Sequence, residues 1–480
     1  MNSRSTISNM LWRFLERCGA QGVSFVVAIV LARLLGPEDY GTIALVTVFT
    51  SILQVFIDSG LGTALIQKKN ADNIDFSTVF FFNLIMCGVI YICMFFAAPF
   101  IADFYGKPEI TALVRVLSLN IVISGISHIQ YSYVSKNLMF KKLFFATLSG
   151  TILSAIIGIA MAYKGFGFWA LVAQNLSNHV INALITWIMV RWRPQFVFSF
   201  QRFKGLFSYG WKFFASGLLD RVYNELRQLI IGKKYSSTDL AFYNKGRQLP
   251  NYLITNINTS IDSVLLPTMS KVQDDKDAVK AMTRRAIKTS SFIIWPCMVG
   301  LGVCAEPLIR LLLTESWMQS VPFLRIFCFT MAFYPVHTAN LNAIKAMGRS
   351  DLFLRLEIIK KVYGIIAIAI SMWFGVFWMA ASLLVTTVIS SFVNASPNKK
   401  LMGYSYLEQL KDMLPAILLA AAMGTVVYCV QFLGLSDILT LLVQLPVGIA
   451  IYVFGSYILK FDSFTYVLGV LKSFKKNKKA

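Results

Sequence analysis

Apolar segments of about 20 residues recur along the whole chain and constrain its fold more than any other feature. An α-helix of that length spans about 30 Å, the thickness of the hydrocarbon core of a bilayer. Hydrophobic residues make up 56% of the 480 residues and charged residues only 14%, whereas a soluble domain carries about 25% charged residues. The sequence therefore predicts an all-α polytopic membrane protein. We expect about fourteen spans by this length criterion, near residues 11–35, 41–66, 78–102, 111–135, 143–163, 168–190, 206–231, 249–269, 290–313, 321–346, 356–374, 377–393, 413–433 and 438–459.

Basic residues outnumber acidic residues, 45 to 23, and the excess lies in alternate loops. Loops rich in Lys and Arg stay on the cytoplasmic side of a membrane. Such loops include residues 191–204, residues 271–288 and the tail 472–479. The pattern predicts a multi-pass protein with both termini in the cytoplasm. A nucleic-acid partner would need this charge gathered in one soluble domain, so we expect none.

One stretch near the N-terminus recurs loosely in the middle of the chain. Residues 11–41 and 211–244 each contain a span with a polar stripe, then Gly, a short polar turn, an acidic residue and Tyr. The match pairs Gly36 with Gly232, and an acidic residue of each turn with its counterpart. Internal repeats are common in transporters, with the substrate site between the halves. We expect a six-span N-lobe at 1–192, a cytoplasmic linker at 193–205, a six-span C-lobe at 206–398, two extra spans at 399–462 and a basic cytoplasmic tail at 463–480.

Charged side chains lie inside several spans, where each costs at least about 2.5–3.5 kcal/mol if it faces lipid. Arg13, Glu16 and Arg17 share one face of the first span because they are three and four residues apart. We expect that face to line a wet cavity inside the helix bundle or to lie close to the headgroups. Snorkelling at the cytoplasmic surface is the structural alternative for the two arginines.

The charges within and beside the spans form two sets of candidate site residues. Cationic groups suit an anionic cargo, since guanidinium binds phosphate oxygens in a bidentate way. Carboxylates in a membrane suit coupling to protons or sodium ions, because desolvation disfavours an uncompensated charge. The candidate substrate-binding residues are Arg13, Arg17, Arg221, Lys245 and Arg247. The candidate ion-coupling residues are Glu16, Asp58, Asp220, Glu225 and Asp262.

Structural roles compete with these functional assignments. An internal ion pair is the alternative for the group that contains Asp220, Arg221 and Glu225. A pair between the adjacent Asp220 and Arg221 has poor geometry, since helical neighbours diverge by about 100°. The sixth span carries a stripe of uncharged polar residues, which is typical of hydrogen bonds that join helices. The members of this stripe are Asn175, Asn178, His179 and Asn182.

Several catalytic and nucleotide-binding signatures are missing from the sequence. It contains no Walker A loop, no HExxH zinc motif and no GxSxG nucleophile elbow. The seven cysteines lie in apolar stretches without CxxC spacing, which indicates neither a disulfide framework nor a metal site. We therefore expect no enzyme activity and no cofactor other than a transported H⁺ or Na⁺. A membrane glycosyltransferase or polysaccharide polymerase is the alternative from another class, and the short outer loops disfavour it.

Four stretches of the chain resemble one known family. They are ARLLGPEDYG at 32–41, DSGLG at 58–62 with IQKK at 66–69, LLP at 265–267 with KVQDD at 271–275, and ESW at 315–317. These stretches are similar to the Wzx-type polysaccharide-transport flippases of the multidrug/oligosaccharidyl-lipid/polysaccharide exporter superfamily, in the branch that contains the colanic acid and teichuronic acid exporters. The resemblance covers nearly the whole chain, and its first two stretches together are the most specific.

The resemblance implies two lobes in a V-shaped bundle that works by alternating access, with spans one, two, seven and eight lining the cavity. It implies a cargo of undecaprenyl-diphosphate-linked oligosaccharide, the repeat unit of an LPS O-antigen, capsule or exopolysaccharide. This cargo would move from the inner to the outer leaflet of the bacterial cytoplasmic membrane, with the two extra spans forming a groove for its lipid tail. We expect a monomer in the lipid bilayer, with the polysaccharide polymerase and export machinery as candidate partners. A multidrug or cation antiporter of the same superfamily is the alternative transporter.

Overall fold

The computed structural model describes residues 3–58 and 60–477, and all side chains there except those of residues 3–11, 13–18, 58, 209, 212, 213, 260, 263 and 470–477. Every regular element within these residues is a helix. The helices are α1 (Ser3–Leu34), α2 (Pro37–Asp58), α3 (Leu61–Gln67), α4 (Asn73–Tyr105), α5 (Ile110–Lys136), α6 (Phe140–Tyr163), α7 (Phe168–Met189), α8 (Phe200–Lys234), α9 (Ser237–Ser270), α10 (Lys276–Val303), α11 (Ala305–Leu312), η1 (Glu315–Ser320), α12 (Val321–Ala332), α13 (Tyr334–Ala346), α14 (Ser350–Ser371), α15 (Val376–Met402), α16 (Tyr406–Cys429), η2 (Val430–Leu433), α17 (Asp437–Ile458) and α18 (Asp462–Asn477).

Eight helical segments of the described chain are long and apolar enough to cross a membrane. They are Pro37–Gln67, Asn73–Tyr105, Ile110–Lys136, Phe140–Tyr163, Lys276–Val303, Val376–Met402, Tyr406–Leu433 and Asp437–Ile458. Large apolar side chains point outward from them, since Phe100 is 76% exposed and Ile449 64%, whereas the polar Asn83 and Gln409 are fully buried. This distribution is expected where the surface meets lipid. The predicted all-α polytopic class is confirmed, and the number of fourteen spans stays a prediction.

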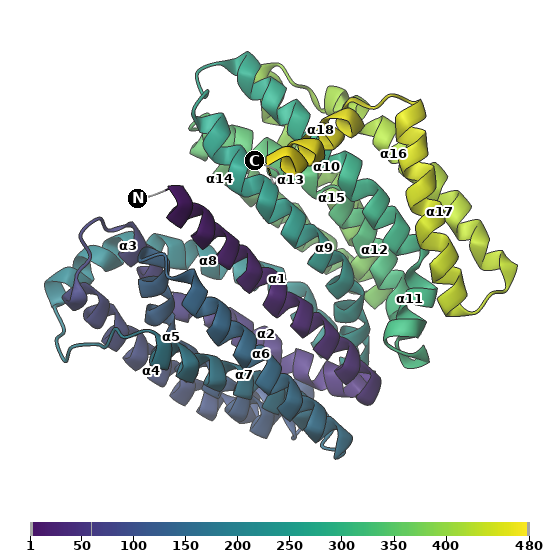
Figure 1. Ribbon diagram of the computed structural model, residues 1–480. Helices are drawn as coiled ribbons and strands as arrows, with labels where there is room; N and C mark the ends of the chain where they lie inside the picture. Colours follow the sequence, from purple (N-terminus) through teal and green to yellow (C-terminus); the bar gives the residue numbers. More distant parts are fainter. Residues whose placement is uncertain (1–2, 59, 478–480) are drawn as a thin grey trace. The chain divides into compact units, whose positions relative to one another are not determined.

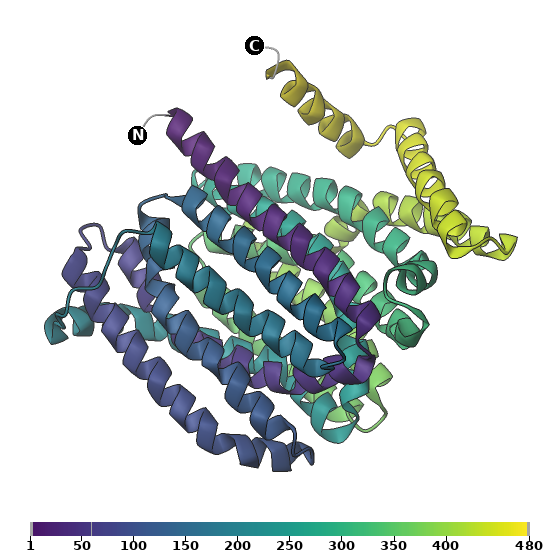
Figure 2. The ribbon, with the colours of Figure 1, turned by 60° about the horizontal axis from the view of Figure 1, so that its bottom comes forward.

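The chain forms two compact units, Met1–Ala241 and Phe242–Ala480. In the first unit α6 packs against both α1 and α7, α4 packs along α5, and α8 packs along α2; Figure 2 shows α1 lying along α6. In the second unit α10 packs against α12, α13 and α16. There α16 and α17 form an antiparallel hairpin near the C-terminus (Figure 1). The predicted lobe and linker boundaries stay predictions.

Local sequence explains where several helices begin and end. Asp72 caps α4 and forms a capping box with Asp75, whose backbone N–H donates to Asp72 Oδ1 at 3.0 Å. Ser405 and Glu408 form the same motif at the start of α16. Such caps satisfy backbone N–H groups that the first turn of a helix leaves without partners. At its other end, α4 is closed by Gly106 in the left-handed conformation, with φ 67°.

The two copies of the sequence repeat share one turn geometry. A turn of two residues joins α1 to α2, and another joins α8 to α9. At the first turn the N–H of Gly36 donates to Asp39 Oδ2 at 3.3 Å, and at the second the N–H of Ser236 donates to Asp239 Oδ2 at 3.2 Å. The correspondence of the acidic residues is therefore confirmed. The match of Gly36 with Gly232 is wrong, because Ser236 occupies the place of Gly36.

The segment between α7 and α8 is fixed to the start of α4. The N–H of Gln195 donates to Ser77 Oγ at 2.9 Å, and the N–H of Ser199 donates to Thr78 Oγ1 at 3.1 Å. Ser77 and Thr78 are fully buried, and Trp192 lies in the core beside them. The segment has no regular secondary structure, yet its backbone N–H groups are satisfied by buried side chains of another helix.

A cluster of charges ties the start of α8 to the same place. Nζ of Lys68 lies 2.6 Å from Oδ2 of the fully buried Asp75, and Nη1 of Arg202 lies 3.4 Å from Oδ1 of that residue. Nη1 of Arg202 also lies 2.5 Å from Asp72 Oδ1. The hydrogen bond from Arg202 holds the pKa of Asp72 below its ordinary value, because it stabilises the charged carboxylate.

Just after α2 ends, Gly60 meets Gly210 of α8 backbone to backbone. A Cβ atom on Gly60 would lie 2.3 Å from the carbonyl oxygen of Gly210, and the φ of Gly60 is 68°. Both the space and the left-handed conformation therefore require glycine at this position. One turn earlier along α2, the rings of Phe56 and Phe214 meet edge to face at 4.9 Å. These contacts hold α8 along α2 and so position the charged residues of α8.

Candidate functional site

The middle of α8 carries an ion pair that is braced by two other groups. Nε of Arg221 lies 3.2 Å from Oε1 of Glu225, one helical turn away, and also donates to the carbonyl oxygen of Ser51 on α2 at 3.2 Å. The amide of Gln228 donates to Oε2 of Glu225. Glu225 is only 7% exposed. Both of its carboxylate oxygens thus have a hydrogen-bond or ion-pair partner.

Two further charged residues of α8 flank this pair. Asp220 is exposed, whereas Arg227 is buried. Sequence reasoning selected Asp220 and missed Arg227. Its spacing of two residues from Glu225 points it to nearly the opposite side of the helix, so the stripe that selected Glu225 gave no signal for it. A buried guanidinium is costly unless it is paired, so Arg227 joins the candidate residues of α8.

Lys245 lies near the start of α9 and is 6% exposed. Its ammonium group lies 5.2 Å from the ring centre of Trp317 in η1. The adjacent Gly246 lets the backbone of α9 approach α12, since a Cβ there would lie 2.6 Å from Cβ of Phe323. Lys245 thus takes part in a cation–π contact inside the second unit. The ESW stretch of the sequence contains the aromatic partner, and sequence reasoning did not connect the two residues.

A pair of hydrogen bonds joins α9 to α13. Thr338 Oγ1 donates to Asn258 Oδ1 at 2.6 Å, and the amide of Asn342 donates to Asp262 Oδ1 at 2.7 Å. The two donors are four residues apart on α13 and the two acceptors four residues apart on α9, so one helix face bonds to another. Asp262 has Asn342 as its partner, a residue that sequence reasoning missed. A regular i, i+4 pattern of polar residues was the available signal.

Arg247 differs from the other candidate cations whose side chains are described. It is half-buried on α9, and the described side chains offer it no hydrogen bond or ion pair. Arg221 and Lys245, in contrast, have the partners given above. Among these three, Arg247 is the one for which the described side chains leave the whole guanidinium available to an anion.

Four candidate residues fall outside the described side chains. Arg13, Glu16 and Arg17 belong to α1, and Asp58 is the last residue of α2. Their assignments as substrate-binding or ion-coupling residues stay predictions.

The polar stripe of α7 joins helices, as expected from sequence. Its amides and imidazole contact polar side chains of α5 and α6. The contacts are Asn175 with Asn120 at 2.6 Å, His179 with Ser124 at 3.4 Å, Asn182 with Tyr131 at 2.7 Å and Asn178 with Ser154 at 3.1 Å. Such bonds stabilise helix packing where water is scarce.

The second unit contains a fully buried amide network between α13, α15 and α16. Asn340 and Gln409 bond reciprocally, at 2.8 Å and 3.0 Å, and the amide of Asn398 donates to Asn340 Oδ1 at 2.6 Å. One turn away, Asn394 lies 3.0 Å from Nδ1 of His337. The network makes Asn340 and His337 links between helices of the second unit. Among the described side chains, no group of His, Cys, Asp and Glu residues could hold a metal ion.

The family model described as "Polysaccharide biosynthesis protein" matches residues 30–322, which is more than half of the chain. The chain belongs to this family. The match covers the repeat turns, the Arg221–Glu225 pair and the α9 candidates. It confirms the resemblance to polysaccharide-transport proteins that the sequence indicated.

Three relatives of known description extend over most of the chain. The succinoglycan biosynthesis transport protein ExoT of Rhizobium meliloti is 24% identical over 86% of this chain and 82% of its own length. The teichuronic acid biosynthesis protein TuaB of Bacillus subtilis is 25% identical over 80% of each chain. The lipopolysaccharide biosynthesis protein WzxC of Escherichia coli is 22% identical over 88% of each chain. The chain therefore spans the greater part of each of these relatives.

Two solved structures share the fold. The lipid II flippase MurJ, in an inward closed conformation, matches 94% of this chain and 99% of its own with a TM-score of 0.74 and 18% identity. An inward-facing multidrug resistance transporter of the MATE family matches 80% of this chain and 95% of its own with a TM-score of 0.62 and 16% identity. At these identities the similarity establishes the fold alone.

Proposed function

We propose that this protein is a flippase that moves an undecaprenyl-diphosphate-linked oligosaccharide from the inner to the outer leaflet of the bacterial cytoplasmic membrane. The observation that carries the proposal is the family match over residues 30–322, together with relatives named for succinoglycan, teichuronic acid and lipopolysaccharide biosynthesis. Both termini face the cytoplasm in this proposal, and the protein acts as a monomer. The polymerase and export machinery of the polysaccharide are its candidate partners.

Transport is coupled to H⁺ or Na⁺ through the carboxylate of Glu225. In the described structure that carboxylate accepts from Gln228 and pairs with Arg221. A proton or sodium ion on Glu225 would weaken its attraction for the guanidinium, because opposite charges interact strongly only while both are present. Arg221 would then be free to contact an anionic group of the cargo. The return of Glu225 to its charged form would restore the pair and release that group.

Arg247 supplies a second contact to the diphosphate or to acidic sugars. Its guanidinium is not committed to any described side chain, and it can bind two phosphate oxygens at once. Arg13 and Arg17 would add charge from α1. Asp58, Asp220, Asp262 and Glu16 are the remaining coupling candidates.

The test uses the purified full chain in sealed liposomes that contain a fluorescent undecaprenyl-diphosphate oligosaccharide. An external glycosidase reports which leaflet holds the sugar, with and without an imposed pH or sodium gradient. We expect protein-dependent movement that responds to one of the gradients. Movement that ignores both gradients would refute the coupling. No movement of any lipid-linked sugar, together with uptake of small organic cations, would refute the proposed cargo and favour the antiporter; glycosyl transfer would favour a glycosyltransferase or polymerase.

A matched pair of variants tests the role of Arg247. Arg247→Ala should slow movement of the lipid-linked sugar by about tenfold, as expected for the loss of a charge-assisted hydrogen bond. Arg115→Ala is the control, since Arg115 is also half-buried but lies 4.1 Å over the ring of Phe95 and donates to that residue's carbonyl oxygen. Equal rates in the two variants would remove Arg247 from the substrate-binding set.

A further inference from the structure

Two apolar crevices in the second unit share one arginine. The first lies between α10, α12 and α16 and has a volume of about 290 Å³. The second lies between α12 and α15 and has a volume of about 650 Å³. Arg325 and Phe329 of α12 line both. They are one helical turn apart, so together they form the ridge that separates the crevices.

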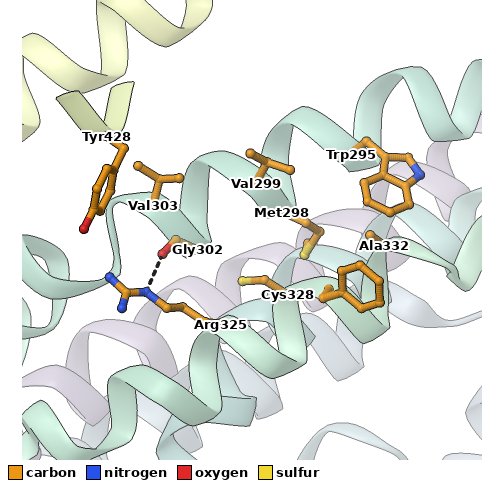
Figure 3. Close-up of a pocket in the computed structure, with 10 residues that line it drawn as sticks. Trp295, Met298, Val299, Gly302, Val303, Arg325, Cys328, Ala332 and Tyr428 are labelled. Carbon is orange, nitrogen blue, oxygen red and sulfur yellow. Dashed lines mark hydrogen bonds between the residues drawn. The ribbon is translucent and has the colours of Figure 1, made fainter. Parts of the chain in front are cut away.

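Figure 3 shows the first crevice with Arg325 at one end and Trp295 at the other. Nε of Arg325 donates to the carbonyl oxygen of Gly302 at 3.2 Å, and its Nη2 donates to Oε1 of Glu306 at 2.8 Å. Its Nη1 has no hydrogen-bond partner among the described residues. The side chains of Arg325 and Glu306 are 41% and 40% exposed. One cation and one anion therefore lie side by side at the edge of the crevices, and Nη1 of Arg325 can still donate hydrogen bonds.

The walls of the crevices are apolar and open to the outside of the unit. Phe329 and Tyr428 are exposed at the first, and Val385 and Val388 at the second. The helices that supply the other walls, α10, α15 and α16, are long and apolar enough to cross a membrane, where such surfaces meet lipid chains. Arg325 is four residues inside α12, which begins at Val321, so it lies about 6 Å from the end of the helix. That depth suits a group at the boundary between hydrocarbon and headgroups.

We propose that this ridge binds one glycerophospholipid of the bilayer, with its two acyl chains on either side of α12 and its phosphate on Arg325. The two crevices match two chains joined at one headgroup, and the free Nη1 matches a phosphate oxygen. Glu306 makes the site complementary to a zwitterion, because it can accept from the ammonium group of phosphatidylethanolamine. A purely anionic headgroup would share Arg325 with Glu306 and leave the site with one negative charge in excess. The charge pattern of the loops places this end of α12 in the outer leaflet.

The site does not depend on the proposed function, since none of its residues belongs to the candidate transport set. Native mass spectrometry of the full chain with added palmitoyl-oleoyl phosphatidylethanolamine tests it. We expect one tightly bound lipid in the wild type, and about a tenfold loss of occupancy in Arg325→Ala. Arg310→Ala is the matched control. Arg310 is also 41% exposed and ion-paired, to Glu315 and Asp437, but lines neither crevice.

A second set of variants keeps Arg325 and so separates binding from folding. Val385→Trp should fill the second crevice from its exposed wall and reduce binding of the two-chain lipid more than that of its single-chain lyso form. Glu306→Gln should shift the preference from phosphatidylethanolamine toward phosphatidylglycerol. Equal loss in Arg325→Ala and Arg310→Ala, no effect of Val385→Trp, or binding of undecaprenyl phosphate in place of the two-chain lipid would each overturn the proposal.

Discussion

The guanidinium of Arg221 joins two helices, because its Nε lies 3.2 Å from Glu225 Oε1 on α8 and 3.2 Å from the carbonyl oxygen of Ser51 on α2. The contact to Ser51 is to backbone, so it persists whatever side chain stands there. The contact to Glu225 depends on charge. A change of charge on Glu225 therefore alters one of the two bonds and leaves the other in place.

Glu225→Gln should abolish the response of transport to the coupling gradient. Glutamine keeps an acceptor oxygen for Gln228 but carries no charge to pair with Arg221 and no proton to exchange. The liposome assay with imposed gradients measures this effect. Asp103→Asn, an exposed change near the end of α4, is the control and should keep the wild-type response. Full gradient dependence in Glu225→Gln would assign coupling to another carboxylate.

Gly60→Ala should lower the free energy of unfolding by about 1–3 kcal/mol. The added methyl group would collide with the carbonyl oxygen of Gly210 at 2.3 Å, and alanine is strained at φ 68°. Thermal unfolding in detergent measures the loss. Gly88→Ala on α4 is the control, because a Cβ there meets nothing within 4 Å; it should be neutral or slightly stabilising. Equal stability of the two variants would mean that α2 and α8 can separate here without cost.

Asn340→Ala should destabilise the second unit by about 0.6–2 kcal/mol for each hydrogen bond lost. It leaves the buried amides of Gln409 and Asn398 without their shared partner. The double variant Asn340→Leu with Gln409→Leu should recover part of the loss, because it removes polar groups on both sides. A double-mutant cycle that compares Asn340→Leu, Gln409→Leu and the double variant by thermal unfolding gives the coupling free energy between the two residues. Strictly additive effects would contradict a shared network.

Asp72→Asn should lower stability at neutral pH and make no difference in acid. The pKa of Asp72 is below its ordinary value of 3.8 because of the hydrogen bond from Arg202. The charged form of Asp72 therefore stabilises the folded state at any pH above about 3.8. This contribution is lost as the pH falls through the lowered pKa of the folded state. Asparagine preserves the helix cap, so the variant removes only charge. Thermal unfolding from about pH 7 to about pH 3 should show the two curves converging; a constant gap would show that the cap, not the charge, matters.

Sequence periodicity was sufficient for the class of fold and for the interhelical role of the α7 stripe. Both follow from local rules: apolar length decides spanning, and uncharged polar residues at helical spacing need partners in a neighbouring helix. The acidic positions of the repeat, Asp39 and Asp239, were found because each caps a turn within three residues of itself. The glycine match failed because Gly36 serves the turn, whereas Gly232 lies inside α8 beside Leu45.

Partners far apart in sequence could not be predicted in this way. Asn342 lies 80 residues from Asp262, and Trp317 lies 72 residues from Lys245. Nothing in local spacing distinguishes these residues from other polar or aromatic residues of the spans. Their pairing depends on how α9 docks against α13 and η1, which is decided by packing such as that of Gly246. The candidate site could therefore be placed on the right helices without its bonds being known.

The chain between α7 and α8 bears on where this protein can be cut or extended. A segment without helix or strand is usually the first choice for an inserted tag or for dividing a protein into two co-expressed halves. Here such an insertion would break the bonds from Gln195 and Ser199 to buried hydroxyl groups of α4. Among the residues that the structure describes, the exposed turn between α9 and α10 makes no comparable bonds to a buried helix. A functional split or insertion should therefore succeed between Lys271 and Asp274, which are exposed, and fail between Gln195 and Ser199.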